Sequence, residues 1–177
     1  NEQEAREQGI AYEVVKYGVA CDRALFDQVC REVGPLTRRD AAALTPVIAA
    51  CCRLKGAIVA SDERETGARR VLNFGHTVGH ALEAGTRYRR LLHGEAVAYG
   101  MLAACAIAVK RGSLAAADRD IIAAAIAQLG PLPPVNDLSA AAQLEFMHHD
   151  KKVHEGRLHF VLPTGIGSVQ IVTDVSE

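Results

Sequence analysis

Two histidines in the middle of the chain have types and spacing that suit chemistry. His76 and His80 are four residues apart in GHTVGH, so on a helix both rings project from one face, about one turn apart. This arrangement suits two nitrogen ligands of a metal ion or two contacts to an anionic substrate, and it also suits two structural histidines. A glycine precedes each histidine, and glycine costs about 1 kcal/mol relative to alanine inside a helix. We therefore expect another segment to approach this backbone closely.

A third histidine and a carboxylate extend the possible metal site. His93 opens HGEAV at the start of an apolar segment, where its ring could reach back toward GHTVGH or cap and pack its own helix. Glu13 and Lys16 lie three residues apart in a valine-rich segment, and their ordinary interpretation is an exposed ion pair. Two or three histidines and one carboxylate from different helices match a catalytic zinc site, in which three protein ligands leave one position open. Satisfied core histidines remain an equal alternative. The other histidines follow no such pattern and are expected on the surface or in strands: His148, His149, His154 and His159.

Basic and amide side chains flank these histidines in the sequence. Lys55, Arg69 and the pair Lys151-Lys152 fall at the ends of predicted elements, where they could hold carboxylate or phosphate groups or could simply be solvated. Asn73 precedes His76 by three residues and would present its amide on the same helical face.

The elements that must position these residues are mostly helices. The chain of 177 residues is 49% hydrophobic, 23% charged and only 5% aromatic, which is typical of a globular, alanine-rich helical protein. The tail is different, because residues 158–163 and 168–175 are rich in β-branched or aromatic residues and predict a β-hairpin. We expect a mainly α fold with this small C-terminal hairpin, in one domain over residues 1–177. Apolar spacing and capping residues predict helices near 10–17, 22–34, 38–61, 71–85, 96–111, 115–129 and 139–149, the second ended by Gly34-Pro35.

Charge and cysteine content exclude several classes of partner. A formal net charge of −1 disfavours nucleic acid. Five cysteines without a CxxC pair fit buried thiols in a reducing cytoplasm. No uninterrupted apolar run reaches membrane-spanning length, and the first residues do not form a signal peptide. We expect a cytoplasmic protein without a membrane partner.

Four phrases of the sequence resemble a known family. AYEVVKYG, KGAIVASDERETGARRVLNFGHTVGHALE, LLHGEAVAYGM and DKKV, in this order, are similar to the carboxy-terminal metal-binding domain of 3-dehydroquinate synthases, a sugar phosphate cyclase family. The resemblance spans residues 9–175 and implies that Glu13, His76 and His93 are zinc ligands. It makes His80 a substrate and acid-base residue. It also implies a substrate site lined by Lys16, Lys55, Arg69, Asn73 and one of Lys151 and Lys152.

One departure from the family motif lies next to a predicted ligand. Tyr12 stands between Ala11 and Glu13, where the family's motif has no residue. One extra residue predicts that the helix upstream of Glu13 is rotated by about 100°.

The resemblance also implies an activity. The family converts the sugar phosphate DAHP into 3-dehydroquinate and phosphate in the shikimate pathway, using Zn²⁺ or Co²⁺ and a transient oxidation by NAD. This sequence has no glycine-rich phosphate-binding loop after a strand. We therefore expect the family's amino-terminal NAD-binding α/β domain to be absent from this chain, the isolated chain to be inactive, and the complete enzyme to be a homodimer. The alternatives are a related cyclase of the inosose or valiolone type and a non-catalytic metal-binding fragment.

Overall fold

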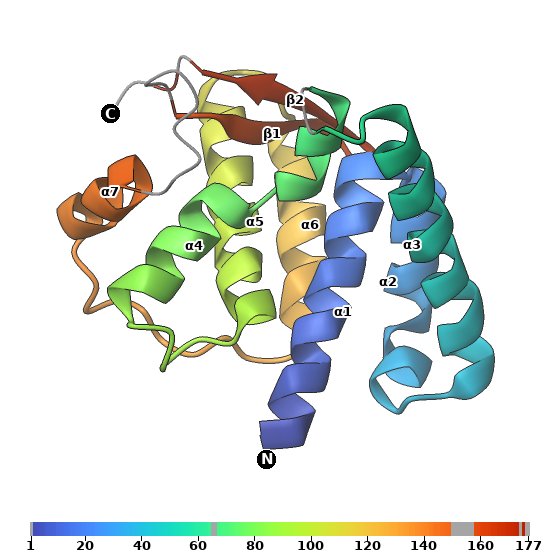
Figure 1. Cartoon of the computed structure of the whole chain (residues 1–177). Helices are drawn as coiled ribbons and strands as arrows, with labels where there is room; N and C mark the ends of the chain where they lie inside the picture. The colour runs from blue at the N-terminus through green and yellow to red at the C-terminus, as the bar shows by residue number, and fades with distance from the viewer. Residues whose placement is uncertain (1, 65–66, 150–157, 174, 176–177) are drawn as a thin grey trace.

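The computed structural model describes residues 2–64, 67–149, 158–173 and 175, and its fold is mainly helical with one antiparallel hairpin (Figure 1). The elements are α1 (Glu2–Cys21), α2 (Arg23–Thr37), α3 (Ala41–Ser61), the 3-10 helix η1 (Ala68–Asn73), α4 (His76–Gly85), α5 (His93–Lys110), α6 (Ala116–Gln128), α7 (Ala140–His149), β1 (Phe160–Gly165) and β2 (Ser168–Val172). The predicted mainly α fold with a C-terminal hairpin is confirmed.

Helix α5 is the central helix of the fold, as its nearly uniform apolar sequence predicts. It packs against α1, α4, α6 and β1, and its buried face includes Gly94, Val97 and Met101. In Figure 1 the hairpin lies across one end of the helices, while α2 and α3 stand beside α1 on the side away from α4. The core therefore forms where α1, α5 and α6 meet under the hairpin.

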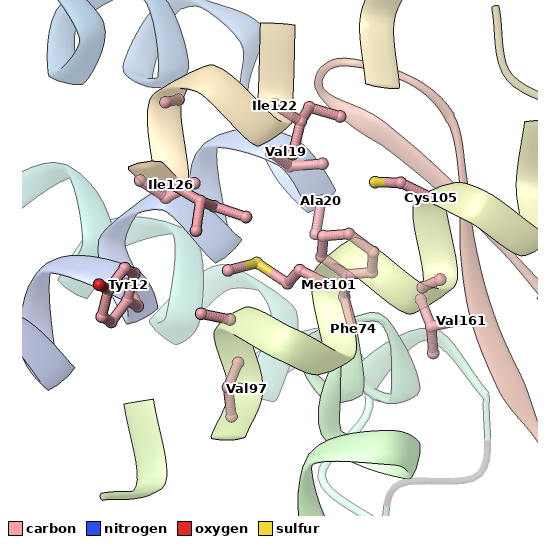
Figure 2. Close-up of a cluster of buried hydrophobic side chains, with 14 of the residues drawn as sticks. Tyr12, Val19, Ala20, Phe74, Val97, Met101, Cys105, Ile122, Ile126 and Val161 are labelled. Atoms are coloured by element: carbon pink, nitrogen blue, oxygen red, sulfur yellow. The ribbon is translucent and has the colours of Figure 1, made fainter. Parts of the chain in front are cut away.

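Large apolar side chains from distant segments meet in this core (Figure 2). Three of them have no exposed surface: Phe74, which follows η1, Met101 of α5 and Ile122 of α6. Ile126 of α6 is almost as completely buried. Removing each such side chain from water contributes about 1.5–3 kcal/mol to the stability of the fold. Burial also raises the pKa of the Cys105 thiol to about 12, which keeps it protonated.

The cysteines only partly follow the expectation of buried thiols. Cys105 is buried, but Cys52 is exposed on α3. Most of α3 is not buried, since Val47 is its one fully buried residue, and Cys52 lies on the exposed part of this helix.

Helix α2 is longer than its sequence predicts. Asp22 caps it as expected, because its Oδ1 accepts hydrogen bonds from the backbone N–H groups of Ala24 and Leu25 at 2.8 and 3.1 Å. The predicted end at Gly34-Pro35 is wrong, since the helix continues to Thr37. The backbone leaves helical geometry at Glu32, so Pro35 lies in the first turn of a new helical segment, where a missing N–H costs little.

The predicted helix over 71–85 is divided into two elements. Residues up to Asn73 form η1, and α4 begins at His76 after Gly75, whose φ of 79° is left-handed. A Cβ at Gly75 would lie 2.8 Å from the carbonyl oxygen of Val97, and one at Gly79 would lie 3.1 Å from that of Ala96. The expected close approach to these glycines is confirmed, and the approaching segment is α5.

Helix α1 accommodates the additional Tyr12 as a core residue. The side chain has no exposed surface, and its hydroxyl donates a hydrogen bond to the carbonyl oxygen of Gly130 at 3.2 Å. One turn earlier, α1 touches the start of α5 so closely that a Cβ at Gly94 would lie 2.2 Å from the carbonyl oxygen of Gly9. The helix is unbroken on both sides of Tyr12, so Glu13 stays on an ordered helix near the start of α5.

Among the described residues, α3 is the one helix long and apolar enough to cross a membrane by length and composition. One such helix is weak support for a membrane span. In this structure α3 packs against α1, α2 and η1. Its Lys55 lines a pocket together with residues of α1, so the helix is part of the domain.

Candidate metal and substrate site

Three elements bring a carboxylate and two histidines together at one point. Glu13 comes from α1, and His76 and His93 are the first residues of α4 and α5. One potential ligand atom of each lies within 4.8 Å of the others. The ring centroids of His76 and His93 are 5.3 Å apart, and Nε2 of His93 is 3.7 Å from Oε1 of Glu13. The structure therefore gathers the three residues that the family resemblance implies as zinc ligands.

Local hydrogen bonding prepares His76 for this position. Its Nδ1 lies 3.1 Å from the carbonyl oxygen of Phe74, so in the neutral ring Nδ1 carries the proton and donates it. Nε2 is then the nitrogen with a lone pair for a ligand. The left-handed turn at Gly75 makes this contact possible by placing the Phe74 carbonyl at the start of α4.

The state of the Glu13 carboxylate tests whether a metal fits here. Its Oε2 pairs with Nζ of Lys16 at 2.5 Å, whereas its Oε1 is buried and has no hydrogen-bond partner within the part of the chain that the structure describes. A buried carboxylate oxygen without a partner is costly, and a cation beside it would remove that cost. One carboxylate oxygen and two imidazole nitrogens are donors that Zn²⁺ prefers, so these residues fit a divalent metal.

The Glu13–Lys16 pair is not the exposed ion pair of the ordinary interpretation. Lys16 is only 4% exposed, because α1 turns this face toward η1 and α3. A buried ammonium needs its partner far more than a solvated one does.

A pocket of about 260 Å³ opens beside the metal group. It is lined by Glu13, Lys16, Tyr17, Lys55, Arg69, Leu72, Asn73 and His76. Six of these eight residues are among those singled out in the sequence. Three of them are cations from three different elements, so the pocket suits a small ligand with more than one anionic group.

The pocket also shows how Arg69 and Asn73 reach the site. Both lie on η1 rather than on the helix of His76, so the prediction that Asn73 shares a helical face with His76 is wrong. Asp62, buried at the end of α3, accepts hydrogen bonds through Oδ2 from the backbone N–H groups of Gly67 and Arg69 at 2.8 and 3.1 Å. Asp62 thus fixes the start of η1.

Sequence reasoning missed Asp62, Tyr17 and Leu72. The signal for Asp62 is its place between the end of a helix and the turn residues before Gly67. Tyr17 follows Glu13 by four residues and so shares its face of α1. Burial and the nearby Glu13 carboxylate raise the pKa of Tyr17 to about 12, so its phenol remains a hydrogen-bond donor at neutral pH.

His80 lies one turn beyond His76 and outside the lining of the pocket. Its ring centroid is 5.3 Å from that of His76 and 6.0 Å from that of His93. With Glu83 and His93 it forms a second group that could hold a metal, and this group shares His93 with the first. The group containing Glu13 is the one that opens onto the pocket.

The remaining predicted residues lie elsewhere. Lys151, Lys152 and His154 fall outside the described residues. His148 is exposed on α7. The carbonyl oxygen of His159 accepts a hydrogen bond from Oγ1 of Thr77 at 3.0 Å, which joins the hairpin to α4.

Solved structures show which class of protein has this fold. The chain matches 2-epi-5-epi-valiolone synthase from Streptomyces hygroscopicus subsp. jinggangensis 5008, solved with NAD⁺ and Zn²⁺, with a TM-score of 0.86 and 27% identity, over 97% of this chain and 48% of that one. It also matches 2-deoxy-scyllo-inosose synthase complexed with carbaglucose-6-phosphate, NAD⁺ and Co²⁺, with a TM-score of 0.82 and 21% identity, over 97% and 48% of the two chains. The fold is that of one half of a sugar phosphate cyclase.

The family within this class follows from the sequence matches. The model of the 3-dehydroquinate synthase C-terminal family matches residues 9–153, and the chain belongs to this family. It is 43% identical over 166 residues to the 3-dehydroquinate synthase of Solibacter usitatus (strain Ellin6076), covering 94% of this chain and 46% of the relative. It is 45% identical over 167 residues to that of Geobacter metallireducens (strain ATCC 53774 / DSM 7210 / GS-15), covering 93% and 46%. The chain thus spans about half the length of these relatives.

Proposed function

We propose that this chain supplies the metal and substrate site of a 3-dehydroquinate synthase, which converts DAHP into 3-dehydroquinate and phosphate. The observation that carries the proposal is the pocket beside Glu13 and His76, into which Lys16, Lys55 and Arg69 bring three positive charges. DAHP is a small sugar acid with a carboxylate and a phosphate. A pocket with cations on several sides and a metal group at one edge matches such a substrate.

Glu13, His76 and His93 would hold the metal. When bound, Zn²⁺ or Co²⁺ supplies a Lewis acid for the substrate hydroxyl that is oxidised, and NAD, held mainly by the amino-terminal domain, accepts the hydride. The two sugar phosphate cyclases solved with NAD⁺ and Zn²⁺ or Co²⁺ support this cofactor set.

The chain's own side chains would bind and orient the substrate. Lys55 and Arg69 would pair with its anionic groups, and the amide of Asn73 would orient a ring hydroxyl. His80 would exchange protons with the substrate from its place beside the metal group. Lys151 or Lys152 would be a further substrate contact, and the support for it is the resemblance of the DKKV phrase to the family.

The degree of similarity favours this reaction over that of the related cyclases. The chain is 43–45% identical to the dehydroquinate synthases but 21–27% identical to the inosose and valiolone synthases. All three reactions start from a phosphosugar, so fold and metal donors do not distinguish them. The residues around the pocket must do so, and DERETGARR supplies Arg69 among them.

The test is a substrate comparison in a complete enzyme. The chain would replace the matching half of the Geobacter metallireducens enzyme, and phosphate release would be measured with NAD, Zn²⁺ and either DAHP or the sugar phosphates used by the other two cyclases. We expect turnover of DAHP alone. Turnover of another sugar phosphate in preference to DAHP would contradict the proposal, and the unmodified Geobacter enzyme is the positive control.

A further inference from the structure

Glu83 is a buried carboxylate that neither the family resemblance nor the pocket explains. It lies on α4, seven residues after His76 and three after His80, so the three side chains share one face of the helix. The residue is only 8% exposed. Buried carboxylates are rare unless they are paired, so its partner indicates its role.

The partner of Glu83 is His93. Oε1 of Glu83 lies 3.2 Å from Nδ1 of His93, while the other ring nitrogen, Nε2, faces Glu13 at 3.7 Å. The His93 ring therefore lies between two carboxylates, one at each nitrogen. In a neutral imidazole only one nitrogen carries a proton, and a carboxylate at Nδ1 holds it there.

The close packing of α4 and α5 makes this contact possible. A Cβ at Gly79 would lie only 3.1 Å from the carbonyl oxygen of Ala96, so the two helices touch through their backbones here. Glu83 lies one turn after Gly79 on α4, opposite the start of α5. A larger residue at position 79 would push the two helices apart close to the point where Glu83 contacts His93.

We infer that Glu83 is a positioning residue for the metal site: it accepts the Nδ1–H of His93 and so presents Nε2 of that ring to a metal shared with Glu13 and His76. This inference rests on the proposed metal-binding function. A carboxylate behind a ligating histidine fixes the ring's orientation and raises its basicity, and losing such a partner typically weakens metal affinity about 10–100-fold.

The second possible metal group, which includes His80, Glu83 and His93, is the competing interpretation of the same contact. In that interpretation Glu83 would bind the metal directly, together with His80 and with Nδ1 of His93. The pocket argues against it, since the pocket is lined by Glu13 and His76 and not by Glu83. A catalytic metal needs a position open to substrate, and the Glu83 side chain is 11% exposed whereas that of Glu13 is 28% exposed.

The test measures Zn²⁺ affinity of the chain by competition with a chelating dye, without any enzymatic activity. For Glu83→Ala we expect about 10–100-fold weaker binding. For Glu83→Gln we expect a smaller loss, because the amide oxygen can still accept the Nδ1–H. For Glu13→Ala, which removes a ligand, we expect a far larger loss than for either. The visible spectrum of the Co²⁺-loaded Glu83→Ala chain should keep the bands of the unmodified chain, because the ligand set is unchanged.

The matched control is Glu95→Gln. Glu95 is also buried at the start of α5, and its Oε2 accepts the backbone N–H of Leu92 at 2.7 Å, a bond that glutamine can also accept. We expect unchanged Zn²⁺ affinity there. Circular dichroism of each metal-free variant establishes that it is folded.

The measured Zn²⁺ affinities test the role of Glu83 separately from the metal site itself. Glu83→Ala binding Zn²⁺ as tightly as the unmodified chain would overturn this inference alone. A loss as large as that of Glu13→Ala, with an altered Co²⁺ spectrum, would overturn it in favour of Glu83 as a ligand. An unmodified chain that binds no Zn²⁺ would overturn the proposed metal site and this inference with it.

Discussion

The two carboxylate oxygens of Glu13 lie in different surroundings. Its Oε2 is paired with Lys16 at 2.5 Å, and its buried Oε1 is the oxygen left for a metal. The ion pair with Lys16 thus fixes the orientation of the carboxylate. One oxygen of this side chain thus serves an ion pair, and the other is the one that we propose for the metal.

The ligand assignment predicts unequal effects of the neighbouring histidines. Replacing Glu13, His76 or His93 by alanine should weaken Zn²⁺ binding by orders of magnitude, because each supplies one of three donors from a separate element. His80→Ala should leave binding nearly intact and slow catalysis in a complete enzyme. Metal content after dialysis measures the first effect, and equal loss in the His80 and His76 variants would refute the assignment.

The cations of the pocket predict a loss of substrate affinity without a loss of stability. In a complete enzyme, Lys55→Ala and Arg69→Ala should raise KM for DAHP or slow turnover. Tm should fall by no more than a few degrees, because Lys55 is exposed and the half-buried Arg69 makes a solvent-exposed hydrogen bond to the carbonyl oxygen of Glu63. Steady-state kinetics and thermal melts provide the two measurements. Arg119→Ala is the control, because Arg119 pairs with Asp120 on the surface. Unfolding of either pocket variant would show that its side chain is structural.

At the scale of elements, glycines determine how closely the helices approach. A Cβ at Gly94 would lie 2.2 Å from the carbonyl oxygen of Gly9, and one at Gly100 would lie 1.7 Å from that of Gly75. Both obstacles are backbone atoms, so neither can move without moving a helix. The first contact fixes α1 against α5 and the second fixes α4 against α5, which together set the distances among Glu13, His76 and His93, the three proposed metal ligands.

These contacts predict that alanine is harmful at two glycines and harmless at a third. Gly94→Ala and Gly100→Ala should each destabilise the chain by about 1–3 kcal/mol or more through overpacking, and should weaken Zn²⁺ binding as well. Gly56→Ala on α3 meets no atom within 4 Å and should stabilise the chain by about 0.5–1 kcal/mol. Urea midpoints give the comparison. Equal midpoints for the Gly56 and Gly100 variants would contradict this account of the packing.

At the scale of the whole molecule, the proposed ligands of the metal lie in this chain, whereas its sequence shows no loop of the kind that holds the phosphates of NAD. The chain spans 46% of the length of its dehydroquinate synthase relatives, and its sequence has no glycine-rich phosphate-binding loop. A nicotinamide must touch the reacting hydroxyl for hydride transfer. With the proposed function, these two facts lead us to expect that this half of the enzyme binds metal and substrate and the other half binds NAD.

The isolated chain should therefore bind Zn²⁺ but neither bind NAD measurably nor release phosphate from DAHP. Fusing the amino-terminal half of the Solibacter usitatus relative to it should restore turnover. Calorimetry with NAD and a phosphate-release assay on both proteins check this. Sustained turnover by the 177-residue chain alone would contradict the proposed division.

Much of the secondary structure was predictable from local sequence patterns. Apolar spacing located α5 and the hairpin, and the glycines before His76 and His80 correctly indicated a close neighbour, because helix periodicity and glycine's lack of a side chain act within a few residues. The end predicted at Gly34-Pro35 was wrong, because Pro35 is tolerated in the first turn of the helical segment that follows the kink at Glu32. The helix predicted over 71–85 was divided, because Gly75 has a left-handed backbone within a segment whose apolar spacing looks continuous.

Only the tertiary structure decided how distant residues meet. Glu83 reached His93 because α4 and α5 touch through their backbones at Gly79, and Lys16 became buried because α1 turns its face toward η1 and α3. Tyr17 lines the pocket because α1 packs beside α3 and η1, and Asp62 acts through its hydrogen bonds to the backbone at the start of η1. The sequence alone determined which residue types were available and which helix faces they occupied. Their distances depend on packing between helices, which no local pattern contains.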